Sequence, residues 1–261
     1  MSANKLARSD EAFVLDQRPV KRRVGLVVLA TDHTTERDFA RLCPPDEVGI
    51  YANRVAYENP TTPENLRRMQ PRLTESAALI LPGEPLDAIY YSCTAASVVI
   101  GDDAVTEAVH QAKPDVPVIT PSAAAATGLK ALGAQQISIL TPYLPETGAA
   151  IRGYFERRGF TVASLECLGL ADDRKMARIS RDSLVKAAVA TSHRDAAALF
   201  ISCTALRALE VAEEIEQRIG KPVVTSNQAA LWRTLRIVGV TRPIRGFGRL
   251  LTLPTLVLAD G

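Results

Sequence analysis

The sequence predicts an α/β protein made of two pseudo-symmetric Rossmann-like lobes, each with a four-stranded parallel sheet, and an active site in the cleft between them. Apolar, strand-like runs alternate with helical patterns along the 261 residues, which is typical of sheets built from β-α-β crossovers. The tetrapeptide Ser-Cys-Thr-Ala occurs twice, at residues 92–95 and 202–205, and the same order of patterns surrounds both copies. A nearly constant offset between the two halves therefore indicates an internal repeat.

The predicted elements divide evenly between the two halves. The eight strand patterns lie near residues 24–30, 47–55, 88–92, 116–120, 137–141, 161–168, 197–202 and 223–225. The clearest helical patterns cover residues 62–80, 95–112, 144–158, 181–191 and 206–219. We expect a first lobe of residues 23–125 joined by a returning segment at 225–261, a second lobe of residues 126–224, and a flexible N-terminal arm at residues 1–22.

Composition excludes several classes of function. A net charge of +2 and an aromatic content of 5% argue against a nucleic-acid-binding surface. No apolar run is long enough to cross a membrane, and the N-terminus lacks the apolar core of a secretory signal, so we expect a cytoplasmic protein. Four cysteines are too few for a disulfide scaffold, and the three histidines are not spaced as a zinc site. No metal is therefore predicted.

The repeated tetrapeptide puts two cysteines, Cys93 and Cys203, at equivalent positions. Each follows an apolar strand pattern and precedes a helical one. At the start of a helix, free N–H groups and the helix dipole favour a thiolate, so we expect a lowered pKa at both thiols. The other two cysteines, Cys43 and Cys167, are interpreted as small packed residues.

The loops after the predicted strands carry a set of polar side chains. In open parallel sheets ligands bind beyond the carboxyl ends of the strands, so two facing lobes bring these loops into one cleft. Hydroxyl groups and helix N-termini on both sides suit a small carboxylate. No glycine-rich dinucleotide fingerprint or P-loop is present, so no nucleotide cofactor is indicated. The loop residues are Thr31, Asp32, His33, Thr34, Thr94, Thr120, Ser122, Thr141, Tyr143, Thr204, Thr225, Ser226 and Asn227.

Two facing thiols suit two kinds of chemistry. One thiolate removes a proton α to a carboxylate while the opposite thiol delivers one, which racemises a stereocentre. Alternatively, a thiolate adds to an activated double bond, the adduct rotates, and elimination gives the other geometric isomer. Backbone N–H groups near Thr94 and Thr204 would hold the developing oxyanion. A non-catalytic binder of small molecules remains an alternative, since two lobes around a cleft also serve as sensors.

The chain resembles the aspartate/glutamate racemase superfamily, in its maleate cis-trans isomerase and arylmalonate decarboxylase branch, over about residues 23–240. The resemblance is carried by Val24–Val28 leading to Thr34-Thr35-Glu36, by residues 92–97 and 202–207, and by Thr141-Pro142-Tyr143. It implies that Cys93 is the nucleophile or first base, that Cys203 is the opposing acid or base, and that Tyr143 holds a substrate carboxylate. It further implies neither metal nor organic cofactor, and a homo-oligomer. An arylmalonate-type decarboxylase needs one cysteine as proton donor, so the presence of both favours an isomerase or racemase.

Two positions depart from the maleate isomerase pattern. His33 replaces a substrate-binding asparagine, and Asp173 replaces a second asparagine. An unpaired acid beside a dicarboxylate is unfavourable, and this pattern is more similar to the ectoine-utilisation protein of the same branch. Its zwitterionic ligands, from ectoine or hydroxyectoine breakdown, would suit His33 and Asp173. The alternative interpretations are a helix-capping loop residue for His33 and a solvated loop acid for Asp173. The predicted substrate-binding set is His33, Thr94, Thr204, Tyr143, Thr31, Ser122 and Asp173.

Overall fold

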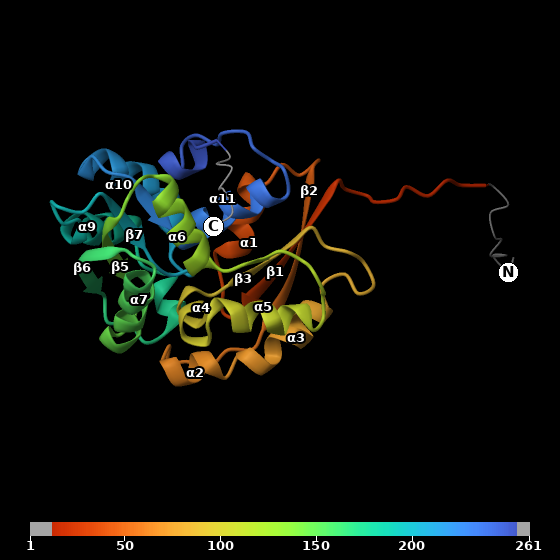
Figure 1. Ribbon diagram of the computed structural model, residues 1–261, viewed down its shortest axis with the longest axis horizontal. Helices are drawn as coiled ribbons and strands as arrows, with labels where there is room; N and C mark the ends of the chain where they lie inside the picture. The colour runs from red at the N-terminus through yellow and green to blue at the C-terminus, as the bar shows by residue number, and fades with distance from the viewer. Residues whose placement is uncertain (1–11, 255–261) are drawn as a thin grey trace, which may run out of the picture.

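The fold consists of two four-stranded parallel sheets, as the computed structural model of residues 12–254 shows (Figure 1). The first sheet has the order β2-β1-β3-β4 and the second the order β6-β5-β7-β8, so both follow one topology. The first contains β1 (Arg22–Leu29), β2 (Val48–Val55), β3 (Ala88–Ser92) and β4 (Val118–Ile119). The second contains β5 (Gln136–Thr141), β6 (Thr161–Cys167), β7 (Ala198–Ile201) and β8 (Val223–Thr225). The predicted fold class and all eight strands are confirmed, and the shared order agrees with an internal repeat.

Three of the expected helices are interrupted. The pattern at 62–80 forms α2 (Pro63–Arg67) and α3 (Gln70–Ala78). The pattern at 95–112 forms α4 (Thr94–Ile100) and α5 (Asp102–His110), which are separated by Gly101 at φ +100°, a conformation that favours glycine. The pattern at 206–219 starts as a 3₁₀ helix, η1 (Arg207–Val211), before α10 (Ala212–Ile219).

The remaining helices are single segments. Helix α7 (Pro145–Arg157) agrees with its pattern to within one residue, and α9 (Arg181–Thr191) agrees with its pattern completely. The other elements are α1 (Thr35–Leu42), α6 (Pro121–Ala131), α8 (Asp173–Met176), α11 (Ser226–Ile237) and η2 (Arg249–Thr252).

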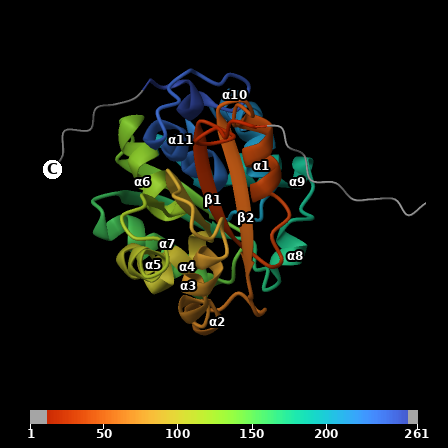
Figure 2. The ribbon, with the colours of Figure 1, turned by 90° about the vertical axis from the view of Figure 1, so that its right-hand side faces the viewer.

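The central strands form the core of each lobe. All of β1 after Arg22 is buried, and β3 and β7 are buried along their whole length. Such continuous apolar burial is expected for parallel strands covered on both faces. Figure 2 shows β1 and β2 with α1 on one side and α3, α4 and α5 on the other. Cys93 directly follows β3, and Cys203 lies two residues after the end of β7, so these buried strands fix the positions of both thiols.

Helices α6 and α11 connect the two sheets. They pack against each other, and both contact β3 of the first sheet and β8 of the second. The lobe boundaries at residues 125 and 225 stay predictions. Of the expected arm, residues 1–11 lie outside the described residues, as do residues 255–261 of the returning segment; residues 12–21 form no helix or strand. No helix within residues 12–254 is long and apolar enough to cross a membrane.

Candidate active site

Cys93 occupies the N-cap of α4. Its backbone is extended, with φ −154° and ψ 107°, and its Sγ accepts a hydrogen bond from the Ala96 N–H at 3.4 Å. The Tyr91 hydroxyl, from the preceding strand, donates to Met69 Sδ at 3.9 Å. The side chain is only 5% exposed. The prediction that this cysteine begins a helix is confirmed.

Cys203 has a different local structure, although its tetrapeptide is identical. Residues 204–206 form a turn, and η1 begins only at Arg207, so the expected helix start at this cysteine is wrong. Its backbone has φ +120°, a region that residues with a Cβ rarely adopt. The Cys203 N–H donates to Ser226 Oγ at 3.0 Å, and Ser226 also accepts from Thr94 Oγ1 at 2.8 Å. One serine of α11 thus joins both copies of the motif.

The pKa of each thiol is raised, not lowered. Burial raises the pKa of Cys203 to about 12, although the Tyr143 hydroxyl and the N–H groups of Ala205 and Leu206 favour its thiolate. Burial raises the pKa of Cys93 well above its usual value, and the Ala96 N–H only partly offsets this. The expectation of lowered pKa values is therefore wrong, because loss of water outweighs the local N–H groups. Both thiols are neutral near pH 7 in this structure.

Two tyrosines and one acid share the environment of the thiols. Tyr143 is 3% exposed, and both Cys93 and Cys203 raise its pKa further above the value that burial gives. Burial also raises the pKa of Tyr57, with Cys93, Asp173 and Cys203 adding to the effect. Both tyrosines therefore lie near the two thiols. Sequence reasoning missed Tyr57, which lies just beyond the end of β2.

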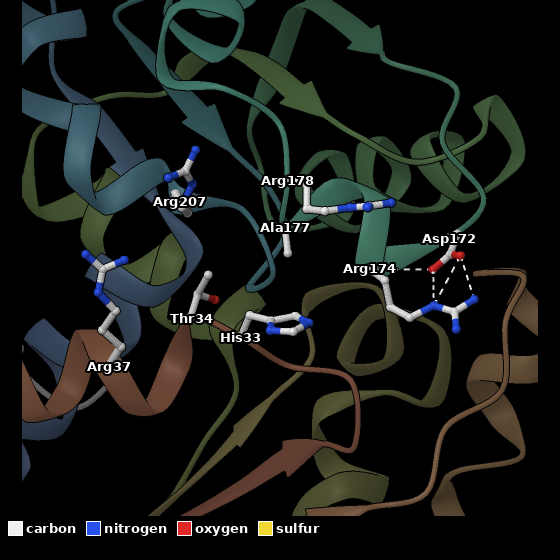
Figure 3. A pocket seen from close by; sticks show the side chains of 8 residues that line it. All are labelled: His33, Thr34, Arg37, Asp172, Arg174, Ala177, Arg178 and Arg207. Carbon is white, nitrogen blue, oxygen red and sulfur yellow. Dashed lines mark hydrogen bonds and ion pairs between the residues drawn. The ribbon is translucent and has the colours of Figure 1, made fainter.

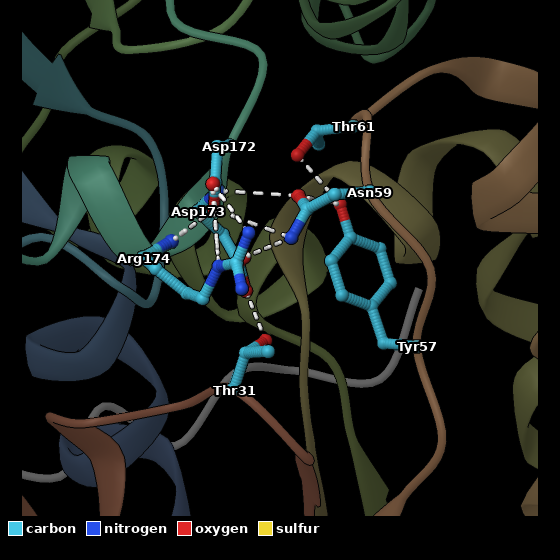
Figure 4. A network of polar contacts seen from close by, with 7 residues as sticks. All are labelled: Thr31, Tyr57, Asn59, Thr61, Asp172, Asp173 and Arg174. Carbon is cyan, nitrogen blue, oxygen red and sulfur yellow. Dashed lines mark hydrogen bonds and ion pairs between the residues drawn. The ribbon is translucent and has the colours of Figure 1, made fainter.

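Asp173 is a buried acid held by residues of the other lobe (Figure 4). It is 4% exposed, so the solvated-acid interpretation is wrong. Its carboxylate accepts hydrogen bonds from the Thr31 hydroxyl and, at 3.0 Å, from Asn59 Nδ2. Within residues 12–254, no lysine or arginine forms an ion pair with it, because Arg174 pairs with Asp172 instead. The site therefore contains one carboxylate without a cationic partner.

Further hydrogen bonds join the two lobes. The Thr61 N–H donates to the Ala171 carbonyl at 2.8 Å, and the Thr147 hydroxyl donates to the Thr61 carbonyl at 3.0 Å. Tyr57 OH and Thr61 Oγ1 lie 2.6 Å apart. The loop after β2 and the loop before α8 are thus hydrogen-bonded to each other across the two lobes. Asn59 and Thr61 were also missed, and their position after a strand end was the available signal.

The hydroxyls of Thr94 and Thr204 are both hydrogen-bonded to other protein groups. Thr94 bonds to Ser226 as above, while Thr204 Oγ1 donates to the Ser92 carbonyl at 3.3 Å. The Thr204 carbonyl accepts from the Thr34 hydroxyl and, at 3.0 Å, from Asn227 Nδ2. These contacts hold the two cysteine loops together.

Two predicted residues lie outside this group. Ser122 is fully buried, and its hydroxyl donates to Asp102 at 3.2 Å, in a cluster with Thr120, Tyr154 and Arg158. His33 is exposed and lines a cavity between residues of the two lobes. The structure therefore brings together the two cysteines, Tyr143, Thr31, Thr94, Thr204 and Asp173. Among the described residues, no three His, Cys, Asp or Glu side chains gather as they would around a metal ion.

The family follows from a sequence model that covers more than half of the chain. The model described as arylmalonate decarboxylase matches residues 72–251, a range that includes both cysteine motifs. The chain belongs to the arylmalonate decarboxylase family. Within that family, a maleate isomerase of Nocardia farcinica is 28% identical over 250 residues, covering 92% of this chain and 99% of the relative. The arylmalonate decarboxylase of Bordetella bronchiseptica is 30% identical over 150 residues, covering 56% of this chain and 62% of the relative.

Solved structures of family members have the same fold. The Nocardia farcinica maleate cis-trans isomerase, as a Cys→Ser mutant with a covalently bound succinylcysteine intermediate, superposes with a TM-score of 0.81 at 26% identity. The shared region covers 88% of this chain and 98% of that structure. A liganded double mutant of arylmalonate decarboxylase superposes with a TM-score of 0.78 at 25% identity and with the same coverage. This family fold thus includes both isomerases and decarboxylases.

Proposed function

We propose that this protein is a cofactor-independent isomerase that acts on a small carboxylic acid through Cys93 and Cys203. The observation that supports this most directly is the pair of buried thiols from the two lobes, whose loops are both hydrogen-bonded to the Ser226 hydroxyl. Cys203 is among the groups that raise the pKa of Cys93, and both thiols raise the pKa values of Tyr57 and Tyr143. A thiol on each side of a bound substrate is the arrangement that two-sided proton transfer requires.

The reaction needs one thiolate and one thiol. In racemisation, the thiolate takes the α-proton and the opposite thiol gives its proton to the other face of the carbanion. In cis-trans isomerisation, the thiolate adds to one alkene carbon, and the resulting adduct rotates about what has become a single bond. The C–S bond then breaks as the double bond re-forms. Tyr143 and the N–H groups of Ala205 and Leu206 stabilise negative charge at Cys203.

The backbone strain at Cys203 also supports a functional role. A residue with a Cβ at φ +120° costs on the order of 1–3 kcal/mol, and such residues cluster at active sites. The cost is offset here by the bond from the Cys203 N–H to Ser226. We infer that the strain holds the thiol toward Tyr143 and Tyr57.

The substrate class follows from Asp173. A buried carboxylate without a cationic partner repels a dianion and attracts a positively charged group. We infer that the substrate is zwitterionic, and we propose a role in ectoine or hydroxyectoine utilisation. The relatives named maleate isomerase make maleate the reference compound against which this is tested.

Proton NMR in heavy water tests the proposal. The compounds are maleate, aspartate, glutamate, phenylmalonate, ectoine and hydroxyectoine, each with wild type, Cys93→Ala, Cys203→Ala and the buried-cysteine control Cys43→Ala. We expect exchange of a C–H for deuterium, or a change of geometric isomer, in wild type and Cys43→Ala only. Full turnover in both site variants would contradict the proposal.

A decarboxylase is the second candidate, and the family model favours it. Loss of carbon dioxide from phenylmalonate needs one proton donor, so one of the two alanine variants would keep its activity. Dependence on both cysteines excludes this candidate. If no compound changes in any variant, while calorimetry detects binding of one of them, the protein is a small-molecule binder.

A further inference from the structure

A basic cavity of about 590 Å³ lies between residues of the two lobes (Figure 3). This volume is typical of small-molecule sites. Residues from three segments line it: His33, Thr34 and Arg37 from the start of α1, Arg174 and Arg178 from α8 and the turn after it, and Arg207 from η1. Both lobes therefore contribute arginine side chains to a single space.

Two of the four arginines are already neutralised. Arg174 forms a bidentate pair with Asp172, with Nε–Oδ1 and Nη2–Oδ2 distances of 2.9 and 2.7 Å. Arg37 pairs with Glu210 at 2.8 Å. Within residues 12–254, no acid lies at ion-pair distance from either Arg178 or Arg207. The cavity thus has an excess of positive charge.

Arg207 is also short of hydrogen-bond acceptors. Its Nη2 donates to the Ile179 carbonyl at 3.1 Å, but its Nε is buried and has no partner among the described residues. A buried donor without an acceptor is unfavourable, and an incoming anionic oxygen would supply the missing acceptor. The guanidinium group matches carboxylate and phosphate oxygens particularly well.

The cavity adjoins the thiol site. Thr34, one of its lining residues, donates a hydrogen bond to the carbonyl of Thr204, next to Cys203. Asp172, also in the lining, immediately precedes the buried Asp173. Neither thiol is among the described residues that line the cavity. A ligand whose reacting end lies at the thiols can therefore extend into this space.

We propose that this cavity binds a distal carboxylate or phosphate group of the substrate, so the substrate is longer than a four-carbon dicarboxylate. Arg207 and Arg178 are its specificity-determining residues. The inference rests on the proposed function in one respect, that the anionic group and the reacting group belong to one molecule.

Two thiol-reactive probes test this without a known substrate. N-(2-carboxyethyl)maleimide carries a carboxylate away from its reactive double bond, and N-ethylmaleimide does not. Peptide mass spectrometry gives the labelling rates of Cys93 and Cys203 separately. Relative to N-ethylmaleimide, we expect the anionic probe to label wild type about tenfold faster, the effect of one charge-assisted contact. Arg207→Gln and Arg178→Gln should abolish this preference, whereas the matched control Arg245→Gln, an exposed arginine outside the cavity, should keep it. High salt should weaken it.

The outcomes separate this inference from the proposed function. Equal rates for the two probes, unchanged in the arginine variants, would overturn the subsite and leave the thiol chemistry intact. Failure of both probes to label either thiol counts against the proposed function, and calorimetry with inorganic phosphate then decides the inference. Binding that weakens about tenfold in Arg207→Gln supports an anion site. Absence of binding to wild type overturns it. If phosphate binds but the anionic maleimide labels the thiols no faster than N-ethylmaleimide, the cavity is an anion site that does not bind the substrate.

Discussion

The two Ser-Cys-Thr-Ala segments have the same sequence and different structures. Cys93 is extended and caps a helix, whereas Cys203 has φ +120° and precedes a turn and a 3₁₀ helix. One backbone N–H, from Ala96, reaches the Cys93 thiol, while two, from Ala205 and Leu206, reach the Cys203 thiol. The Tyr143 hydroxyl, from a separate loop, also favours the Cys203 thiolate, whereas the Tyr91 hydroxyl, from the strand before Cys93, donates to Met69 Sδ at 3.9 Å. An internal repeat can thus supply two identical side chains and still give them unequal chemistry.

The difference arises outside the repeated segment. After the first copy, Ala96 and Ser97 continue a regular helix, and the Ser97 hydroxyl donates to the Cys93 carbonyl at 2.6 Å. After the second copy, Ser226 and Asn227 of α11 bind the Cys203 N–H and the Thr204 carbonyl, at 3.0 Å each. The second loop is therefore held by another helix and not by its own.

The largest expected effect shows which of the two thiols forms a covalent bond to the substrate. With an unsaturated compound that the wild type isomerises, we expect Cys203→Ser to accumulate a covalent adduct on Cys93, because the adding thiol is intact and its opposing acid is lost. Cys93→Ser should form no adduct. Intact-protein and peptide mass spectrometry measure both. An adduct on Cys203 in Cys93→Ser would exchange the roles of the two thiols.

The next effect concerns stability on the Cys203 side. Burial raises the pKa of Asp38, which accepts from Asn227, from 3.8 to about 7. Because the native state holds this proton more tightly, the free energy of unfolding is highest below pH 4 for this group and falls as the pH rises to about 7. Between pH 4 and pH 7 the wild type should therefore lose on the order of 4 kcal/mol of unfolding free energy through this group, and Asp38→Asn should not. Urea unfolding at several pH values measures the difference. The exposed control Asp46→Asn should leave the pH dependence unchanged. If the free energy of unfolding of Asp38→Asn falls with pH as steeply as that of wild type, the prediction is contradicted.

A smaller effect compares the two tyrosines. We expect Tyr143→Phe to slow alkylation of Cys203 about tenfold, because a donor to its thiolate is lost. Tyr91→Phe should change Cys93 less, since the Ala96 N–H is the main group that favours the Cys93 thiolate. Iodoacetamide rates from pH 7 to 10 measure both. Equal slowing at the two sites would mean that their environments are more alike than the structure indicates.

The smallest effect tests the backbone itself. At Cys203, glycine should be more stable than alanine by about 1 kcal/mol, since φ +120° suits glycine. At Cys93, with φ −154°, alanine should be the more stable. Thermal unfolding of the four variants gives the glycine–alanine stability difference at each position. If glycine is favoured, or alanine is favoured, at both positions, backbone strain at Cys203 does not explain the result.

The predictions from sequence succeeded where local pattern decides the structure. Eight strands, the fold class and the start of α4 at Cys93 follow from apolar runs and their order along the chain. The interruption at Gly101 also had a sequence signal, a glycine inside a helical pattern, although residues 95–112 were interpreted as one helix. Tyr57 and Asn59 were missed although they follow β2, whose end the sequence predicts correctly.

The sequence by itself determined the repeated topology and put a cysteine after the corresponding strand of each half, because the alternation of apolar strand and helical patterns is a local property. Tertiary structure decided the chemistry of those cysteines. Closure of the lobes removes water from both thiols and from Asp173, and it brings Tyr143 to Cys203 and Ser226 between the two motifs. Desolvation and cross-lobe hydrogen bonds depend on residues far apart in the chain. For that reason the helix-start argument gave the wrong direction for the pKa of both thiols.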